Sequence, residues 1–176
     1  MLRHSALVAV LALAAGCTPP QPGSAMDATP SPAGSAGAAD TLPLRRFDES
    51  AAASFRYASG LAEPTRVVVR DAEAWSAMWT RITADHRPAT AAPAVDFGRE
   101  MLLVAALGRR ATGGYSVRIE SVSNAGGELV ARVAEQRPGP RCGVTQALTA
   151  PADVVALPRS SLGVRWVVRE VVTDCL

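Results

Sequence analysis

Apolar and polar positions beyond residue 60 follow three different spacings, and each spacing predicts a different element. Apolar side chains recur every three or four residues between 72 and 82, which predicts a helix with one apolar face. Residues 101–107 are apolar without interruption, which predicts a central strand buried on both faces. Residues 115–120 alternate between apolar and polar, which predicts a strand with one face in water. The predicted apolar face of the helix consists of Ala72, Trp75, Trp79 and Ile82.

The remaining segments extend this pattern into a sheet. Residues 66–70 are mostly β-branched and predict a strand, and Asp71 directly after them can cap the helix. The turn residues 124–127 separate residues 115–120 from a second alternating run at 128–135, so the two runs predict a β-hairpin. Three further short strands are predicted at residues 144–149, 153–157 and 164–172. We therefore expect an α+β fold, mainly an antiparallel β-sheet or compact β-sandwich with one packed N-terminal amphipathic helix.

The N-terminus has the pattern of an export signal. Residues 6–15 form an apolar run that follows a charged start and is too short to span a bilayer, which is typical of a secretory signal peptide. Because the run ends directly before Cys17, it resembles a bacterial lipoprotein signal, in which residues 1–16 are removed and Cys17 receives acyl chains such as palmitate. An ordinary cleaved signal followed by an unrelated cysteine is the alternative. In the first case the protein is anchored in the cell envelope, and Thr18 favours the outer membrane if the host is Gram-negative.

A tether and a domain follow the signal. Residues 17–46 are predicted to be the lipidated cysteine and a disordered tether, because their Pro, Ala, Gly and Ser content leaves little apolar surface to offset the entropy of ordering. Residues 45–61 are ambiguous, because their aromatic side chains can dock on the domain or begin its first strand. The folded domain is predicted over residues 62–176.

Composition and charge exclude several functions. The chain has 176 residues and a formal charge of +2, and all its basic residues are arginines, so it has neither a basic patch for nucleic acid nor a phosphate loop with lysine. His86 is the one histidine beyond the signal. A zinc site needs several His or Cys ligands, and a serine triad needs a histidine base next to the serine. A carboxylate pair of Asp96 and Glu100 is an open alternative, although Asp96 is also suited to cap a turn. We expect no catalytic residues, no metal and no cofactor.

Two cysteines remain after the one at the signal. Cys142 and Cys175 form an even pair in a chain with an export signal, which predicts a disulfide between the C-terminus and the loop near Pro140. Two free thiols, one of them a nucleophile, are the alternative. A Cys–His pair would need His86 in contact with the thiol.

The most distinctive stretch is residues 108–115, Gly-Arg-Arg-Ala-Thr-Gly-Gly-Tyr, between the two best-defined strands. Adjacent glycines allow positive φ or close approach of backbone, so this loop can present itself to a partner. The two glycines can equally serve only to make a tight connection, with the tyrosine ring turned inward. The candidate partner-binding residues are Arg109, Arg110, Thr112, Gly113, Gly114 and Tyr115.

In this stretch the chain resembles the C-terminal domain family of the protease complex subunit PrcB. The hallmark is Gly108 followed by Thr112-Gly113-Gly114-Tyr115-Ser116-Val117. The resemblance covers roughly residues 62–172 and implies a small exported domain, often a lipoprotein, associated with a protease complex and without enzymatic activity. The other matching segments are Trp75-Ser76-Ala77-Met78-Trp79, Val95-Asp96-Phe97, Pro138-Gly139-Pro140, Thr149-Ala150-Pro151, Val154-Val155 and Leu157-Pro158.

These observations favour a membrane-anchored, non-catalytic subunit that binds or stabilises an exported protein, a protease in particular. Two alternatives stay open. Thr112-Gly113-Gly114-Tyr115 also resembles the Thr-Thr-Gly-Tyr/Phe loop of chagasin-like inhibitors of cysteine proteases, which implies inhibition of a protease. A structural envelope lipoprotein without a specific partner would have the same anchor and the same fold.

Overall fold

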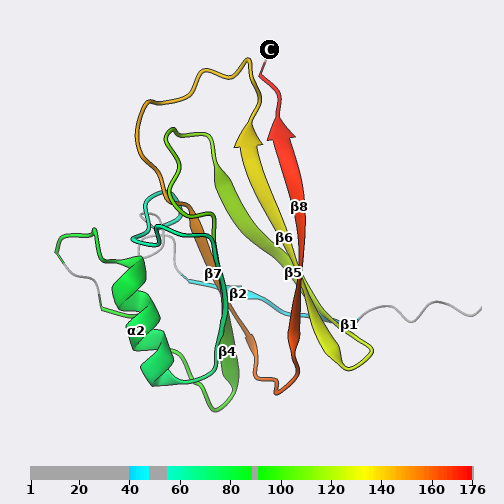
Figure 1. The fold of residues 1–176 in the computed structure, drawn as a ribbon. Coiled ribbons are helices and arrows are strands. Elements are labelled where there is room, and N and C mark those ends of the chain that lie inside the picture. Colours follow the sequence, from blue (N-terminus) through cyan, green and yellow to red (C-terminus); the bar gives the residue numbers. More distant parts are fainter. Residues whose placement is uncertain (1–39, 48–54, 89–90, 176) are drawn as a thin grey trace, which may run out of the picture. The chain divides into compact units, whose positions relative to one another are not determined.

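Two four-stranded sheets, called sheet A and sheet B, pack face to face, and one helix covers the outer face of sheet B (Figure 1). The structure is a computed structural model that describes residues 40–47, 55–88 and 91–175. Sheet A has the order β1-β5-β6-β8 and consists of β1 (Asp40–Leu42), β5 (Ser116–Ala125), β6 (Glu128–Pro138) and β8 (Val164–Thr173). Sheet B has the order β2-β7-β4-β3 and consists of β2 (Arg45–Arg46), β7 (Ala152–Pro158), β4 (Glu100–Ala106) and β3 (Thr65–Val69). The helix is α2 (Ala72–Ile82).

Sheet B is buried on both faces because β4 and β7 carry apolar side chains at successive positions. Successive side chains of a strand point to opposite faces, so each strand contributes to two clusters. Between sheet B and α2 lie Leu102, Val104, Ala106, Ala152, Val154 and Ala156. Between the two sheets lie Met101, Leu103, Ala105, Val155 and Leu157, with Val117, Ile119, Val122, Leu129, Ala131 and Val133 of sheet A. The prediction that residues 101–107 form a strand buried on both faces is confirmed.

The strand pairing is mostly antiparallel. All three pairings of sheet B are antiparallel, as are β1 with β5 and β5 with β6. The predicted hairpin is therefore confirmed, and its turn uses Gly126 and Gly127 at φ of 65° and 85°. The exception is β8, which runs parallel to β6. The chain reaches β8 by crossing from sheet B to sheet A after β7, and this crossing makes the parallel pairing possible.

Helix α2 begins as predicted, but its position and its faces differ from the prediction. The Asp71 carboxylate accepts a hydrogen bond of 2.8 Å from the N–H of Ala74, which confirms the cap. The helix follows three strands, so the prediction of an N-terminal helix is wrong. Ala72 is exposed, and Ala74 and Ala77 share the exposed side with polar residues, so apolar and polar faces are not sharply separated. The buried side chains are Trp75, Met78, Trp79 and Ile82.

Two other segments correct the sequence prediction. Residues 40–46 were assigned to the disordered tether, but they form β1 and β2 because β5 and β7 supply pairing partners for them. Residues 144–149 were predicted as a strand, but only an isolated bridge of Thr149 forms there. The predicted signal 1–16, the lipidation at Cys17 and the first part of the tether lie outside the described residues. Within the described residues, no helix is both long enough and apolar enough to cross a membrane.

Candidate partner-binding site

Three chain segments lie side by side at the end of the sandwich where β4 leads into β5. We call these three segments, residues 57–59, 108–115 and 145–150, the loop platform. The central segment is 145–150. On one side of it, the N–H of Ala150 donates to the carbonyl of Tyr57 at 2.8 Å, which holds the first segment against it.

The distinctive segment 108–115 lies on the other side of the central segment. Arg110 and Thr149 exchange two backbone hydrogen bonds, with N···O distances of 2.7 and 3.0 Å. The N–H of Gly113 donates to the carbonyl of Thr145 at 2.9 Å, and the Thr149 hydroxyl donates to the carbonyl of Thr112 at 2.9 Å. Four hydrogen bonds therefore join this segment to the central segment.

Close packing accounts for both adjacent glycines of this segment. Gly113 is buried, and a Cβ at this position would collide with the Oγ1 of Thr145. Gly114 has φ of 86°, and a Cβ there would lie 3.1 Å from the Cβ of Pro138 and 3.2 Å from the Cγ1 of Val144. Gly113 is therefore required by the contact with segment 145–150, and Gly114 by its positive φ and by the contacts with Pro138 and Val144, so both serve the tight connection.

The larger side chains of the segment divide between the core and the surface. The Tyr115 ring is half-buried against the cluster between the sheets, and the guanidinium carbon of Arg110 lies 5.7 Å from its centroid. Arg109 is exposed, although its N–H donates to the carbonyl of Ala62 at 2.8 Å. Gly108 precedes it with φ of 75° and turns the chain out of β4. Of the two arginines, Arg109 is the more exposed.

Two apolar side chains project from the platform into solvent. Tyr57 is 64% exposed and Leu148 is 70% exposed. Each borders a shallow hollow, and Thr149 lines both hollows. The hollow of about 500 Å³ is lined by Tyr57, Gly113, Gly114, Tyr115, Ser116, Gln136, Thr145 and Thr149. The hollow of about 280 Å³ is lined by Ala58, Ser59, Asp85, Arg109, Leu148, Thr149 and Ala150.

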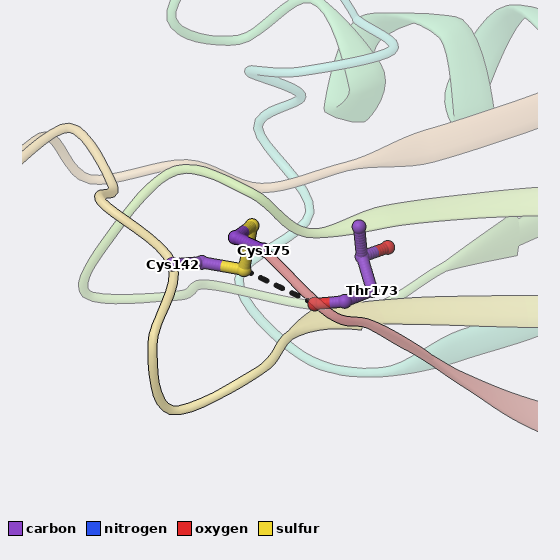
Figure 2. The surroundings of a disulfide bond; sticks show 3 residues. All are labelled: Cys142, Thr173 and Cys175. Carbon is purple, nitrogen blue, oxygen red and sulfur yellow. Dashed lines mark hydrogen bonds between the residues drawn. A yellow bond between two sulfur atoms is a disulfide. The ribbon is translucent and has the colours of Figure 1, made fainter.

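The predicted disulfide is present, and Cys142 precedes the central segment of the platform in sequence. Cys142 and Cys175 are bonded, with their Cα atoms 4.9 Å apart, and they join the loop after β6 to the end of β8 (Figure 2). The Sγ of Cys142 also lies 3.1 Å from the carbonyl oxygen of Thr173. A disulfide sulfur has no proton to donate, so this is a close S···O contact. The bond excludes the alternative of a catalytic thiol at these two positions, because a nucleophilic cysteine must be a free thiolate.

The region that contains the distinctive segment 108–115 matches a known protein family. Residues 101–158 match the family model PrcB C-terminal. The resemblance predicted from the sequence is confirmed over these residues, which run from β4 to the end of β7. No curated protein and no solved structure gives a significant match. Two of the three platform segments, 108–115 and 145–150, lie inside the PrcB C-terminal match.

Each carboxylate of the acidic pair considered as an alternative has a different hydrogen-bond partner. Glu100 accepts two hydrogen bonds from the Arg45 guanidinium, at 2.9 and 2.6 Å, and this pairing holds the pKa of the Glu100 carboxyl below its ordinary value. The Asp96 carboxylate accepts from the N–H of Gly98 at 2.9 Å and so caps a turn. Across the described ranges, no group of three or more His, Cys, Asp or Glu side chains is arranged to hold a metal ion.

All six candidate residues thus belong to one platform, but their structural roles differ. Thr112, Gly113 and Gly114 build the platform, Arg110 and Tyr115 contact each other, and Arg109 is exposed. Sequence reasoning missed Tyr57 and Leu148. The sequence does show a large apolar side chain among polar neighbours at each of these two positions. Their location beside segment 108–115, however, depends on pairing between distant segments.

Proposed function

We propose that this chain is a membrane-anchored, non-catalytic subunit that binds an exported protein, in particular a protease, through the loop platform. The match to the PrcB C-terminal family supports an association with a protease complex. The observation that carries the proposal is the exposure of Tyr57 and Leu148, at 64% and 70%, beside Thr149 and Ala150, whose backbones are hydrogen-bonded to the neighbouring segments. A partner that covers these two apolar side chains would remove them from water, and this burial favours binding.

The chemistry of the platform indicates how a partner is held. Tyr and Arg are the residue types that dominate binding energy at interfaces, and the platform presents Tyr57 and Arg109. A partner that covers the platform would bury the Tyr57 ring and the Leu148 side chain, and would offer a carboxylate to Arg109. Because segment 108–115 is backed by segment 145–150, the surface favours a broad contact over insertion of a single loop into a cleft.

Site-specific photo-crosslinking in cells tests the proposal. A photoreactive amino acid is placed at Tyr57, at Leu148, or at the control position Ala125, the last residue of β5 before the hairpin turn. We expect an adduct with an exported protease from the two platform positions and none from the control. The same adduct from all three positions, or no adduct from any, would overturn the proposal.

Purified components then separate the alternatives. The double variant Tyr57→Ala/Leu148→Asp should keep its circular dichroism and weaken binding of the captured protease by about tenfold or more. If the wild-type chain instead abolishes peptide hydrolysis by that protease, the function is inhibition, as the chagasin-like alternative proposes. Lipid anchoring is tested separately, because Cys17→Ser should release the chain from the membrane fraction.

A further inference from the structure

The outer edge of β8 has no neighbouring strand among the described residues (Figure 1). β8 is 10 residues long and pairs with β6 in an unbroken register, from Val164 opposite Leu129 to Thr173 opposite Pro138. In a paired strand, the N–H and C=O groups of alternate residues point away from the neighbour, so β8 presents free donors and acceptors along its whole length.

Apolar side chains lie exposed along the same edge. Val164 and Trp166 pack into the cluster between the sheets, so the residues at even positions of β8 face sheet B. Val168 and Val172 belong to this series, yet they are 41% and 42% exposed. Both are therefore inward-facing side chains that an additional strand beside β8 would cover.

The usual protections of an edge strand are weak here. Natural edges are blocked by proline, lysine, bulges or inward-pointing charges. β8 contains neither proline nor lysine, its pairing with β6 shows no bulge, and its two arginines, Arg165 and Arg169, are each paired with a carboxylate of another strand of sheet A. Its one inward-facing charge, Glu170, is paired with Arg137 and so is neutralised. A long, open and partly apolar edge of this kind is a template for another strand.

We propose that β8 pairs with β8 of a second copy of this chain, in an antiparallel arrangement centred on Val168. Sheet A of each copy would then join into one continuous sheet around a twofold axis. In this arrangement the inner faces of the two sheets lie on the same side of the joined sheet. Each side chain of β8 therefore lies opposite a side chain that points to the same face. The exposed Val168 meets Val168 of the second copy, and Val164 meets Val172.

The charges of β8 select this register over its neighbours. With the axis at Val168, each of Arg165 and Arg169 lies opposite a valine, and Glu170 lies opposite Trp166. An axis at Val167 would place Arg165 opposite Arg169, and an axis at Arg169 would place two Arg169 side chains opposite each other. Like charges directly opposite destabilise a strand pair.

The remaining registers are poorer. An axis at Glu170 would oppose two Glu170 carboxylates. Axes still nearer either end pair about half of the strand or less. The centred register therefore uses most of β8 and is free of opposed like charges.

A charge-swap experiment tests the register. The exported mature chain carrying Cys17→Ser, so that no acyl chain drives association, is studied by sedimentation. We expect a concentration-dependent dimer for this form. Val168→Lys and Val168→Glu should each raise the dimer dissociation constant by about tenfold or more, because two like charges meet on the axis. An equimolar mixture of the two variants should restore the dimer.

Cysteine crosslinking provides the matched control. Val168→Cys should form a disulfide-linked dimer under mild oxidation, because the two side chains face each other. Arg165→Cys is equally on β8 and exposed, but its two copies would lie about 20 Å apart along the paired strands and should not crosslink.

Several results would overturn the proposal. They are a monomer at all concentrations, a dimer unchanged by Val168→Lys, or faster crosslinking at Arg165 than at Val168. Protection of the β8 amides only by a different protein would show that a partner strand occupies the edge instead. The loop platform is untouched by the Val168 variants, so failure here is distinguishable from failure of the proposed function.

Discussion

The carboxylate of Asp153 on β7 accepts a hydrogen bond of 2.8 Å from the backbone N–H of Ile119 on β5, and this bond joins the two sheets. β1 ends opposite Val122, so within the described part of the chain no strand pairs with β5 at Ile119 on this side. Arg46 completes the arrangement, because it donates to both oxygens of Asp153 and, at 2.5 Å, to the carbonyl of Ile119. The two side chains therefore satisfy backbone groups that the sheet leaves unpaired.

Asp153→Ala should be strongly destabilising. The side chain of Asp153 is 5% exposed, and its loss would leave the Arg46 charge and the Ile119 N–H without their partner. We expect a loss of about 3 to 5 kcal/mol in the free energy of unfolding, measured by urea denaturation. Glu100→Gln is the control, because its pair with Arg45 is more exposed and should cost about 1 kcal/mol or less. Equal losses in the two variants would contradict this role.

Gly113→Ala should destabilise the loop platform through one identifiable contact. The new methyl group would meet the Oγ1 of Thr145, so we expect a loss of about 1 to 3 kcal/mol. Thr145→Ala removes that oxygen, and the double variant should recover most of the loss in a double-mutant cycle. Gly143→Ala has no atom within 4 Å of the added Cβ and should be close to neutral. Additive losses in the double variant would mean that the contact is not the cause.

Removal of the disulfide should loosen the platform as well as the chain end. The bond closes a loop with a sequence separation of 33, and its loss should cost about 3 to 4 kcal/mol by the loop-entropy model. We expect the Cys142→Ser/Cys175→Ser variant to show faster hydrogen exchange at the Gly113 amide, since its acceptor Thr145 lies just after Cys142. The Ala74 amide, which donates to Asp71 at the start of α2, is the reference. Equal acceleration at both amides would indicate global loosening instead.

Acid should weaken the fold through two carboxyls with lowered pKa values. Hydrogen bonds from Arg45 and Arg169 hold the pKa of Glu100 and Glu120, respectively, below the ordinary value of 4.5. Each carboxyl binds a proton less readily in the folded chain, so its stabilisation is present above pH 4.5 and is lost as the pH falls through the folded pKa. Glu100→Gln/Glu120→Gln should lose less stability than wild type when the pH is lowered from about 6 to about 3. A parallel decline in both proteins would show that other groups govern the acid response.

The parts of the fold that a local pattern encodes were predicted correctly. The uninterrupted run of β4, the β5–β6 hairpin and the Asp71 cap depend on neighbouring residues, and each was identified. The PrcB C-terminal resemblance was also recognised from the order of short motifs around Gly113 and Gly114. Local spacing is sufficient in these cases, because side-chain burial and turn geometry are set within a few residues.

The prediction failed where elements depend on distant partners. β1 and β2 are only 3 and 2 residues long, and nothing in their sequence distinguishes them from a tether. Residues 144–149 have the composition of a strand, but their backbone serves the platform through Thr145 and Thr149. The binding candidates show the same limit, because residues 57–59 join the platform through hydrogen bonds of Tyr57 and Ser59 with the distant Ala150.

The sequence by itself determined the main strands and the helix, the disulfide partners and the family resemblance. The elements and the resemblance depend on residue types at short spacing, and the disulfide on an even pair of cysteines. Only the tertiary structure decided that β8 runs parallel to β6 and has no other neighbouring strand among the described residues, and that Tyr57 and Leu148 lie beside residues 108–115. These features arise from backbone hydrogen bonds between segments far apart in the chain. Backbone groups are nearly the same at every residue, so the sequence does not mark which of them will pair.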